Sequence, residues 1–284
     1  MRESGLLGAS DVTTTATFNA ADQLTARGSV TYSYDANGNQ TASSAGQALA
    51  YNAADQTTSL KRAGGSALGA TYAGASQVEW ATAGATTFTN TLLGVSAGGT
   101  TGYTRDPSGA LVGIRGANRS YYLFDGLGSV VAVTSSSGSV TNSYTYDPFG
   151  VTTETKALLT DVFNPWRYAG QYEDTTTGLY KMGARYYQPE LGRWTQQDPS
   201  GQEANAYLYA GSNPINAVDP SGLRNVFTDA FGKVFGGEKC IKQSLGAAAV
   251  AGIAGTVAGT PVAGGAAAIA TGAATNFACK LGLT

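Results

Sequence analysis

The sequence predicts a mainly β protein that ends in a small helical segment. Its 284 residues include 39 glycines and 16 tyrosines among many threonines, serines and valines, a composition that favours short strands joined by tight turns. A short unit, an aromatic residue followed by Asp or Asn, recurs along the first half of the chain. Beyond residue 223 alanine and glycine dominate, and alanine favours helix.

The recurring unit is clearest between residues 18 and 58. Residues 18–25 and 51–58 are identical at six of eight positions, and Tyr34-Asp35 lies between them, so the unit returns every 16 or 17 residues. Looser copies follow at 103–109, 122–126 and 144–150. Each copy predicts a strand that ends in a turn, where the Asx side chain bonds its own backbone and Gly or Asn takes the positive φ.

One such unit cannot bury its aromatic face alone, so neighbouring units are expected to stack into an extended sheet. An ordinary β-sandwich with tyrosines in its hairpins is the other interpretation, but the near-identical copies favour stacking. The units resemble the YD repeats of the RHS and teneurin families, whose signature is a Tyr-Asp pair followed by a Gly turn. This resemblance implies a spiral β-sheet. Because the repeats cover only residues 15–150, we expect a partial shell with exposed sheet edges.

A denser set of motifs fills residues 125–223. In chain order these are DGLGSV (125–130), YDPFG (146–150), YAGQY (168–172), GLY (178–180), ARYYQP (184–189), LGRW (191–194), QDPSG (197–201), NAYLY (205–209), NPIN (213–216) and DPSGL (219–223). Together they resemble the RHS repeat-associated core, which in that family closes one end of the shell and precedes a variable region. The resemblance divides the chain into repeats (1–124), core (125–223) and variable tail (224–284).

Many members of this family cleave themselves in the core, using two aspartates in DPxG motifs and cutting after the Leu of the second motif. Carried over, the resemblance makes Asp198 and Asp219 the catalytic pair and Leu223–Arg224 the cleaved bond. Two carboxylates held close share a proton, so one can take a proton from water while the other polarises the carbonyl. Arg185 or Arg193 could modulate the pair. The module would be at most a single-turnover aspartyl autoprotease.

A purely structural role for the two DPSG motifs is the competing interpretation. Asp-Pro-Ser-Gly suits a type I turn, because Asp accepts from the turn backbone, Pro presets φ and Gly ends the turn. The same four residues occur at 106–109, outside the core. The tetrapeptide alone therefore does not predict catalysis.

The absence of histidine narrows the possible chemistry. Without histidine the chain can build no Ser-His-Asp or Cys-His relay and no imidazole metal site, and two cysteines cannot form a four-thiolate zinc site. The sequence also contains no phosphate-binding loop and no dinucleotide fingerprint. We therefore expect no cofactor and no metal. The net charge of −2 gives no general attraction to nucleic acid.

The tail, residues 224–284, carries five basic and two acidic residues, so its charge is +3 and the rest of the chain is −5. Residues 243–276 are uncharged, and Pro261 divides them into two apolar segments. Each is shorter than the ~20 residues that span a bilayer. A helical hairpin turning at Pro261 would bring Cys240 and Cys279 together and permit a disulfide. The two cysteines could equally be small buried hydrophobic residues.

Three interpretations of this tail stay open. It could be a membrane-active toxin that inserts as a helical hairpin with its basic flank at the lipid headgroups. It could be a low-complexity segment that packs inside the shell or stays unfolded, or a truncated effector without activity. An enzymatic toxin is not expected, because so few polar groups offer no acid, base or nucleophile.

We expect the chain to be the C-terminal part of an RHS-repeat polymorphic toxin, a secreted or surface-associated bacterial protein used in contact-dependent competition or host interaction. Its β-shell would carry its own tail as cargo, with an immunity protein and a target membrane as partners. No secretory signal peptide opens the chain, so we expect another export route or a longer parent chain. The alternative is a non-catalytic cell-surface scaffold or adhesion module, or a truncated inactive fragment, and cleavage after Leu223 separates these possibilities.

Overall fold

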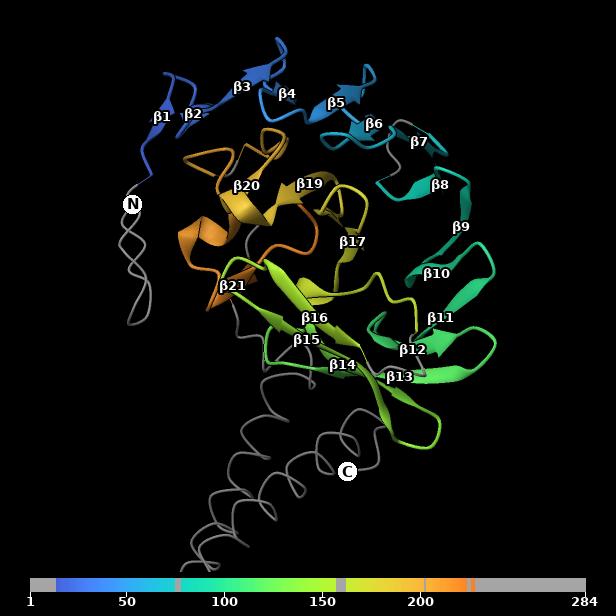
Figure 1. Ribbon diagram of the computed structural model, residues 1–284. Coiled ribbons are helices and arrows are strands. Elements are labelled where there is room, and N and C mark those ends of the chain that lie inside the picture. Colours follow the sequence, from blue (N-terminus) through green and yellow to red (C-terminus); the bar gives the residue numbers. More distant parts are fainter. Residues whose placement is uncertain (1–13, 75–77, 157–161, 202, 224–225, 228–284) are drawn as a thin grey trace, which may run out of the picture. The chain divides into compact units, whose positions relative to one another are not determined.

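The protein is described here by a computed structural model (Figure 1). The structure describes residues 14–74, 78–156, 162–201, 203–223 and 226–227. The chain divides into two compact units, Met1–Asn225 and Val226–Thr284. Strand β22 (Val226–Phe227) is the described part of the second unit. The helical hairpin expected in the tail, with Cys240 and Cys279, lies outside the described residues.

The first unit contains one large antiparallel sheet, and this confirms the mainly β prediction. Sixteen strands lie side by side in chain order, each bonded to the next, and the sheet does not close on itself within the described residues. The strands are β1 (Ala16–Phe18), β2 (Leu24–Arg27), β3 (Val30–Tyr34), β4 (Gln40–Ser43), β5 (Ala48–Tyr51), β6 (Thr57–Lys61), β7 (Leu68–Tyr72), β8 (Trp80–Ala83), β9 (Thr86–Thr91), β10 (Gly94–Gly98), β11 (Thr101–Arg105), β12 (Leu111–Arg115), β13 (Arg119–Phe124), β14 (Val130–Ser135), β15 (Val140–Tyr146) and β16 (Thr152–Lys156).

Six of the turns between these strands follow one pattern, set by the Asx residue that opens each of them. Its Oδ1 accepts hydrogen bonds from the backbone N–H groups two and four residues later. This pattern occurs at Asn19, Asp35, Asn52, Asp106, Asp125 and Asp147. Glycine takes the positive φ in four of these turns. In the two near-identical copies, however, Asp22 (φ 58°) and Asp55 (φ 55°) take it, because a short polar side chain tolerates the left-handed region.

The tyrosine of the repeat explains why neighbouring copies need each other. The Tyr34 hydroxyl donates to the carbonyl of Leu24 (3.2 Å), and the Tyr51 hydroxyl donates to the carbonyl of Gln40 (2.9 Å). Tyr72 and Tyr146 reach back in the same way, to Thr57 and Val130. Each bond ends on a residue that follows the preceding turn, so each of these four repeats satisfies a backbone group of the one before it.

Residues after 162 form a second, smaller arrangement within the same unit. Its elements are η1 (Tyr168–Gly170), β17 (Tyr172–Asp174), β18 (Leu179–Met182), β19 (Arg185–Gln188), η2 (Pro189–Leu191), β20 (Arg193–Trp194), η3 (Tyr209–Ser212) and β21 (Ala217–Val218). Strands β17–β20 form a four-stranded antiparallel sheet. Among the described residues, no helix is long and apolar enough to cross a membrane.

Many side-chain contacts join the two sheets of the first unit. The indole of Trp80 donates to the hydroxyl of Tyr186 (2.8 Å), and the hydroxyl of Tyr207 donates to the carbonyl of Gly38 (2.7 Å). Buried residues of both sheets, including Trp80, Phe88, Leu179 and Tyr186, form one hydrophobic cluster. Figure 1 shows the large sheet bending around these later strands.

The large sheet also bears on the division of the chain. Strands β14–β16 belong to it, although they lie in residues 125–156, which the motifs assign to the core. The boundaries at residues 124 and 223 stay predictions. Residues 162–223 pack on the large sheet and contain Asp198, Asp219 and Leu223, the residues that the sequence assigns to the cleavage site.

Candidate active site

The first aspartate, Asp198, is a buried residue at the start of an exposed turn that follows β20. Its side chain is 6% exposed, and its Oδ1 accepts the backbone N–H of Ser200 (2.9 Å). The N–H of Gly201, at φ 64°, donates to the Asp198 carbonyl (3.2 Å) and closes the turn. The Asp198 N–H donates to the carbonyl of Ala206 (3.0 Å), which fixes the turn against the loop that follows it.

The second aspartate, Asp219, follows β21 and is 1% exposed. Its Oδ1 accepts the Ser221 hydroxyl (3.0 Å) and the backbone N–H of Leu223 (3.2 Å). Its Oδ2 forms an ion pair with Nη2 of Arg185 (3.2 Å), and both side chains are 1% exposed. A carboxylate this deeply buried is costly without a partner, so the guanidinium is what makes the position tolerable.

Arg185 is the residue that connects the two turns. It starts β19, donates through Nη1 to the carbonyl of Ala206 (3.0 Å) and through Nε to the carbonyl of Gly222, and stacks on the ring of Trp194 at 4.1 Å. Burial lowers the pKa of Arg185, and the charges of Asp198 and Asp219 act against that shift. Both aspartates therefore act on one buried cation.

Of the two arginines considered from the sequence, Arg193 faces elsewhere. Its guanidinium donates to the carbonyl of Asp22 and lies over the rings of Phe18 (4.9 Å) and Tyr207 (5.4 Å). It therefore anchors the small sheet to the first hairpin. The sequence did not separate the two arginines, because only the register of β19 and β20 decides which side chain points toward the aspartates.

The second turn is held tightly against the hairpin between β18 and β19. The N–H of Ala184 donates to the carbonyl of Ser221 (2.9 Å). Gly222 has φ 64°, and a Cβ there would lie 2.4 Å from the carbonyl oxygen of Met182 and 3.0 Å from the nitrogen of Arg185. This contact requires glycine, because both the backbone conformation and the space exclude a larger side chain.

Leu223, the residue before the expected cut, contacts both turns. Its N–H donates to Asp219, and its carbonyl oxygen accepts the hydroxyl of Ser200 (2.8 Å). Arg224, on the other side of the expected cut, lies outside the described residues. The sequence missed Ser200, because Ser108 occupies the same place in a DPSG motif of the repeats. The geometry thus places Asp219 and Arg185 on the Gly222–Leu223 peptide group. The hydroxyl of Ser200, which is bonded to Asp198, lies on the carbonyl oxygen of Leu223.

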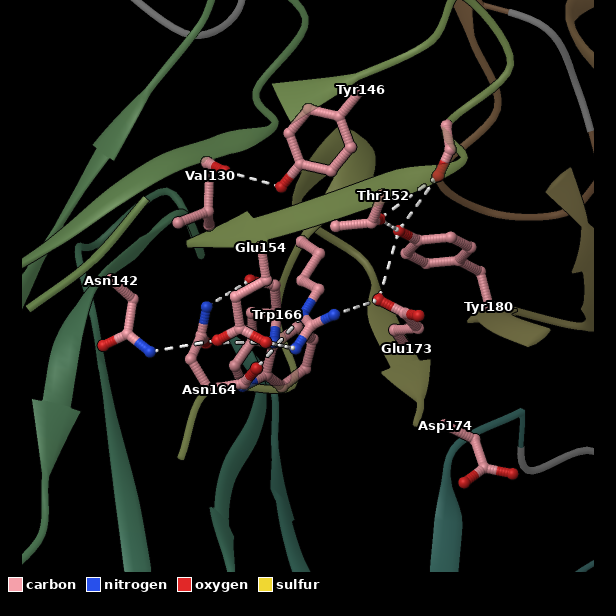
Figure 2. A network of polar contacts seen from close by, with 12 residues as sticks. Val130, Asn142, Tyr146, Thr152, Glu154, Asn164, Trp166, Glu173, Asp174 and Tyr180 are labelled. Carbon is pink, nitrogen blue, oxygen red and sulfur yellow. Dashed lines mark hydrogen bonds and ion pairs between the residues drawn. The ribbon is translucent and has the colours of Figure 1, made fainter. Parts of the chain in front are cut away.

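A second buried charged cluster is structural in character (Figure 2). Arg167 forms ion pairs with Glu154 (2.8 Å) and Glu173 (2.9 Å), and the amide of Asn142 donates to Glu154 (3.0 Å). Burial raises the pKa of Glu173, while Arg167 opposes the shift. Because the cluster links β15 and β16 to β17, it ties the large sheet to the small one. In the described part of the chain, no group of three or more His, Cys, Asp or Glu side chains could hold a metal.

Comparison with known proteins places this fold in a family. A model of the teneurin YD-shell matches residues 91–215. The tRNA3(Ser)-specific nuclease WapA of Bacillus spizizenii is 33% identical over 232 residues, which are 75% of this chain and 10% of WapA. Toxin protein Tse5 of Pseudomonas aeruginosa is 49% identical over 61 residues, which are 21% of this chain and 5% of Tse5.

A solved structure with a similar fold is among the matches. The Tc holotoxin pore of Photorhabdus luminescens matches with a TM-score of 0.56 and 20% identity, over 74% of this chain and 13% of the matched chain. Fold and matches together define a YD-repeat shell protein. More specifically, the chain belongs to the RHS/YD-repeat polymorphic toxin family. It spans about a tenth of the length of the WapA relative.

Proposed function

We propose that this chain is the carrier end of an RHS toxin and that it cuts itself once, between Leu223 and Arg224. The observation that carries this proposal is the position of Leu223. Its N–H is bound by Asp219, and its carbonyl oxygen is bound by the hydroxyl of Ser200, next to Asp198. The turn at 198–201 therefore contacts the carbonyl of the bond that would be cut, and the turn at 219–222 holds the preceding peptide group of the same residue.

The reaction would be hydrolysis of one peptide bond. Water adds to the carbonyl carbon of Leu223, the bond to the nitrogen of Arg224 breaks, and that nitrogen takes up a proton. We assign to Asp219 the removal of the proton from water and its transfer to the leaving nitrogen, because this carboxylate is the one bound to the N–H of Leu223. Asp198, on the side of the carbonyl oxygen, is suited to stabilise the charge that develops there.

Burial of the site supports this chemistry. Both aspartates and Arg185 are buried, and Arg185 lies over the ring of Trp194, so electrostatic interactions among them are stronger than in water. The backbone bonds of the two turns fix the carboxylates before any reaction begins, so little reorganisation is needed. A single cut ends the reaction, so the module would act as a single-turnover aspartyl autoprotease.

The released cargo would be the tail, residues 224–284. Toxins among the relatives support a role in delivering such a cargo to a neighbouring or host cell. The apolar, cationic tail suggests a membrane as its target, and secretion with a cognate immunity protein would follow from that role.

Intact mass spectrometry of the full-length protein tests the cleavage. We expect a released fragment of 61 residues that begins at Arg224. Asp198→Asn and Asp219→Asn should each lower the cleavage rate by a factor on the order of 10⁴, because each removes one half of the acid–base pair. Asp106→Asn is the matched control in the repeat copy of the motif and should cleave at the rate of the original chain.

A full-length chain that keeps its mass on prolonged incubation would contradict the proposal. That result would favour the second candidate, a non-catalytic cell-surface scaffold. One observation supports this alternative: the DPSG motif at 106–109 forms a hairpin turn in the repeats, with Asp106 accepting the N–H groups of Ser108 and Ala110. There the tetrapeptide shapes the sheet.

A further inference from the structure

The hydroxyl of Ser200 lies between an acid and the carbonyl that would be cleaved. Its Oγ is 2.7 Å from Oδ2 of Asp198 and 2.8 Å from the carbonyl oxygen of Leu223. Both distances are those of good O–H···O hydrogen bonds. Asp198 is buried, whereas Ser200 is exposed. The Ser200 hydroxyl therefore links the buried carboxyl group to the carbonyl oxygen of Leu223.

The number of protons on these groups limits how the two hydrogen bonds of Ser200 can form together. A serine hydroxyl has one proton, so it can donate fully to only one of two acceptors. If Asp198 were ionised, the hydroxyl would be drawn to the carboxylate and the Leu223 oxygen would lose its donor. When Asp198 carries a proton, it donates to Oγ, and Oγ donates to the Leu223 oxygen. Both short contacts are then satisfied together.

We propose that Ser200 is a catalytic residue of the self-cleavage, relaying a proton from Asp198 to the carbonyl oxygen of Leu223. This inference rests on the proposed function. As water adds to the carbonyl carbon, the electron pair of the C=O bond moves onto the oxygen. Ser200 donates its proton to that oxygen, and Asp198 replaces the proton on Oγ. When the bond to Arg224 breaks, the oxygen returns the proton along the same path.

The other two serines in DPSG motifs have different contacts. The Ser221 hydroxyl donates to Asp219 (3.0 Å) and accepts the N–H of Leu223 (3.2 Å), so it faces the amide side of that residue. The Ser108 hydroxyl donates to Asp106 (2.6 Å) within its own exposed turn. Ser200 differs from both in contacting an atom whose charge changes during hydrolysis. Ser221 and Ser108, which lie in the same tetrapeptide, therefore serve as two matched references for Ser200.

The test follows cleavage of the full chain over time after cell-free synthesis, with intact mass as the readout. Ser200→Ala should slow release of the 61-residue fragment by about 10²–10³-fold, the usual effect of removing one donor to a developing oxyanion. Ser200→Thr keeps the hydroxyl and should stay within about tenfold of the original rate. Ser108→Ala should cleave at the original rate.

Several outcomes separate the inference from the proposed function. If Ser200→Ala cleaves at the original rate while Asp198→Asn does not cleave, the relay is wrong and the autoprotease stands. If the unaltered chain never cleaves, both fail. A slow Ser200→Ala variant supports the relay when its thermal unfolding matches the original and Ser200→Thr restores the rate. A variant Ser200→Thr as slow as Ser200→Ala, with the chain folded, would instead overturn it.

Discussion

The DPSG turn in the repeats and the two DPSG turns near residue 200 have the same four residues but different surroundings. In all three, the glycine N–H donates to the aspartate carbonyl and closes the turn. Asp106 and Asp219 both use Oδ1 to accept the N–H four residues later. The local structure is therefore the same, and it is what the tetrapeptide encodes. The three turns differ in how deeply the aspartate is buried and in which charged groups lie next to it.

The arginines next to these turns show how far the likeness extends. Arg105 donates to the carbonyl of Gly109 (2.8 Å) and lies over the ring of Trp166, and Arg185 donates to the carbonyl of Gly222 and lies over the ring of Trp194. What Arg185 adds is the ion pair with Asp219. The comparison teaches that the inward position of Asp219 against the guanidinium is what distinguishes the second turn, and we propose that this difference makes it reactive.

Replacing Arg185 or Arg105 by methionine tests this difference and should give the largest effects on stability. Arg185→Met should destabilise the protein by about 3–5 kcal/mol, because it leaves Asp219 buried without its partner, and it should also stop cleavage. Arg105→Met should cost about 2 kcal/mol, the loss of hydrogen bonds from a charged donor. Urea unfolding measures both. Equal costs would mean that the ion pair adds nothing to the second turn.

The glycines that end the turns give a smaller contrast. Gly222→Ala should cost more than about 2 kcal/mol, because the new methyl group would overlap the carbonyl oxygen of Met182 at a positive φ. Gly109→Ala faces the carbonyl oxygen of Leu93 at 3.2 Å and should cost about 1 kcal/mol. The midpoints of thermal unfolding provide the measurement. A Gly222→Ala variant as stable as Gly109→Ala would show that the second turn can move away from the β18–β19 hairpin.

The smallest effect concerns pH. Lys181 in β18 is buried, donates to the carbonyls of Val78 and Gly183, and has a pKa that burial lowers to about 8. Since the unfolded chain holds this proton more tightly, stability should rise with pH above about 8. From pH 7 to pH 9 the original chain should gain about 1.4 kcal/mol relative to Lys181→Met. Stability curves that run parallel for the two proteins would refute the lowered pKa of the buried Lys181.

The sequence predicted more of the fold than of the site. The repeat spacing and the Asx-to-Gly turns predicted the hairpins correctly, because both are local properties of a few residues. The backward bonds of Tyr34 and Tyr51 were not predicted, since they depend on how one repeat lies on the next. Whether Asp198 and Asp219 act as a catalytic pair stays a prediction. The part played by Ser200 needed the fold, because its neighbour Leu223 is 23 residues away.

The contact between Tyr207 and Gly38 has a consequence for timing. These residues are 169 positions apart, and the bond between them seats the loop that separates the two aspartate turns on the first hairpins of the sheet. Long-range contacts form late, since a large loop must close before they add stability. The hairpins, in contrast, join in chain order and can grow one by one as the chain emerges. The order of folding thus sets a delay: the two aspartate turns reach their final geometry only after the sheet around them has formed.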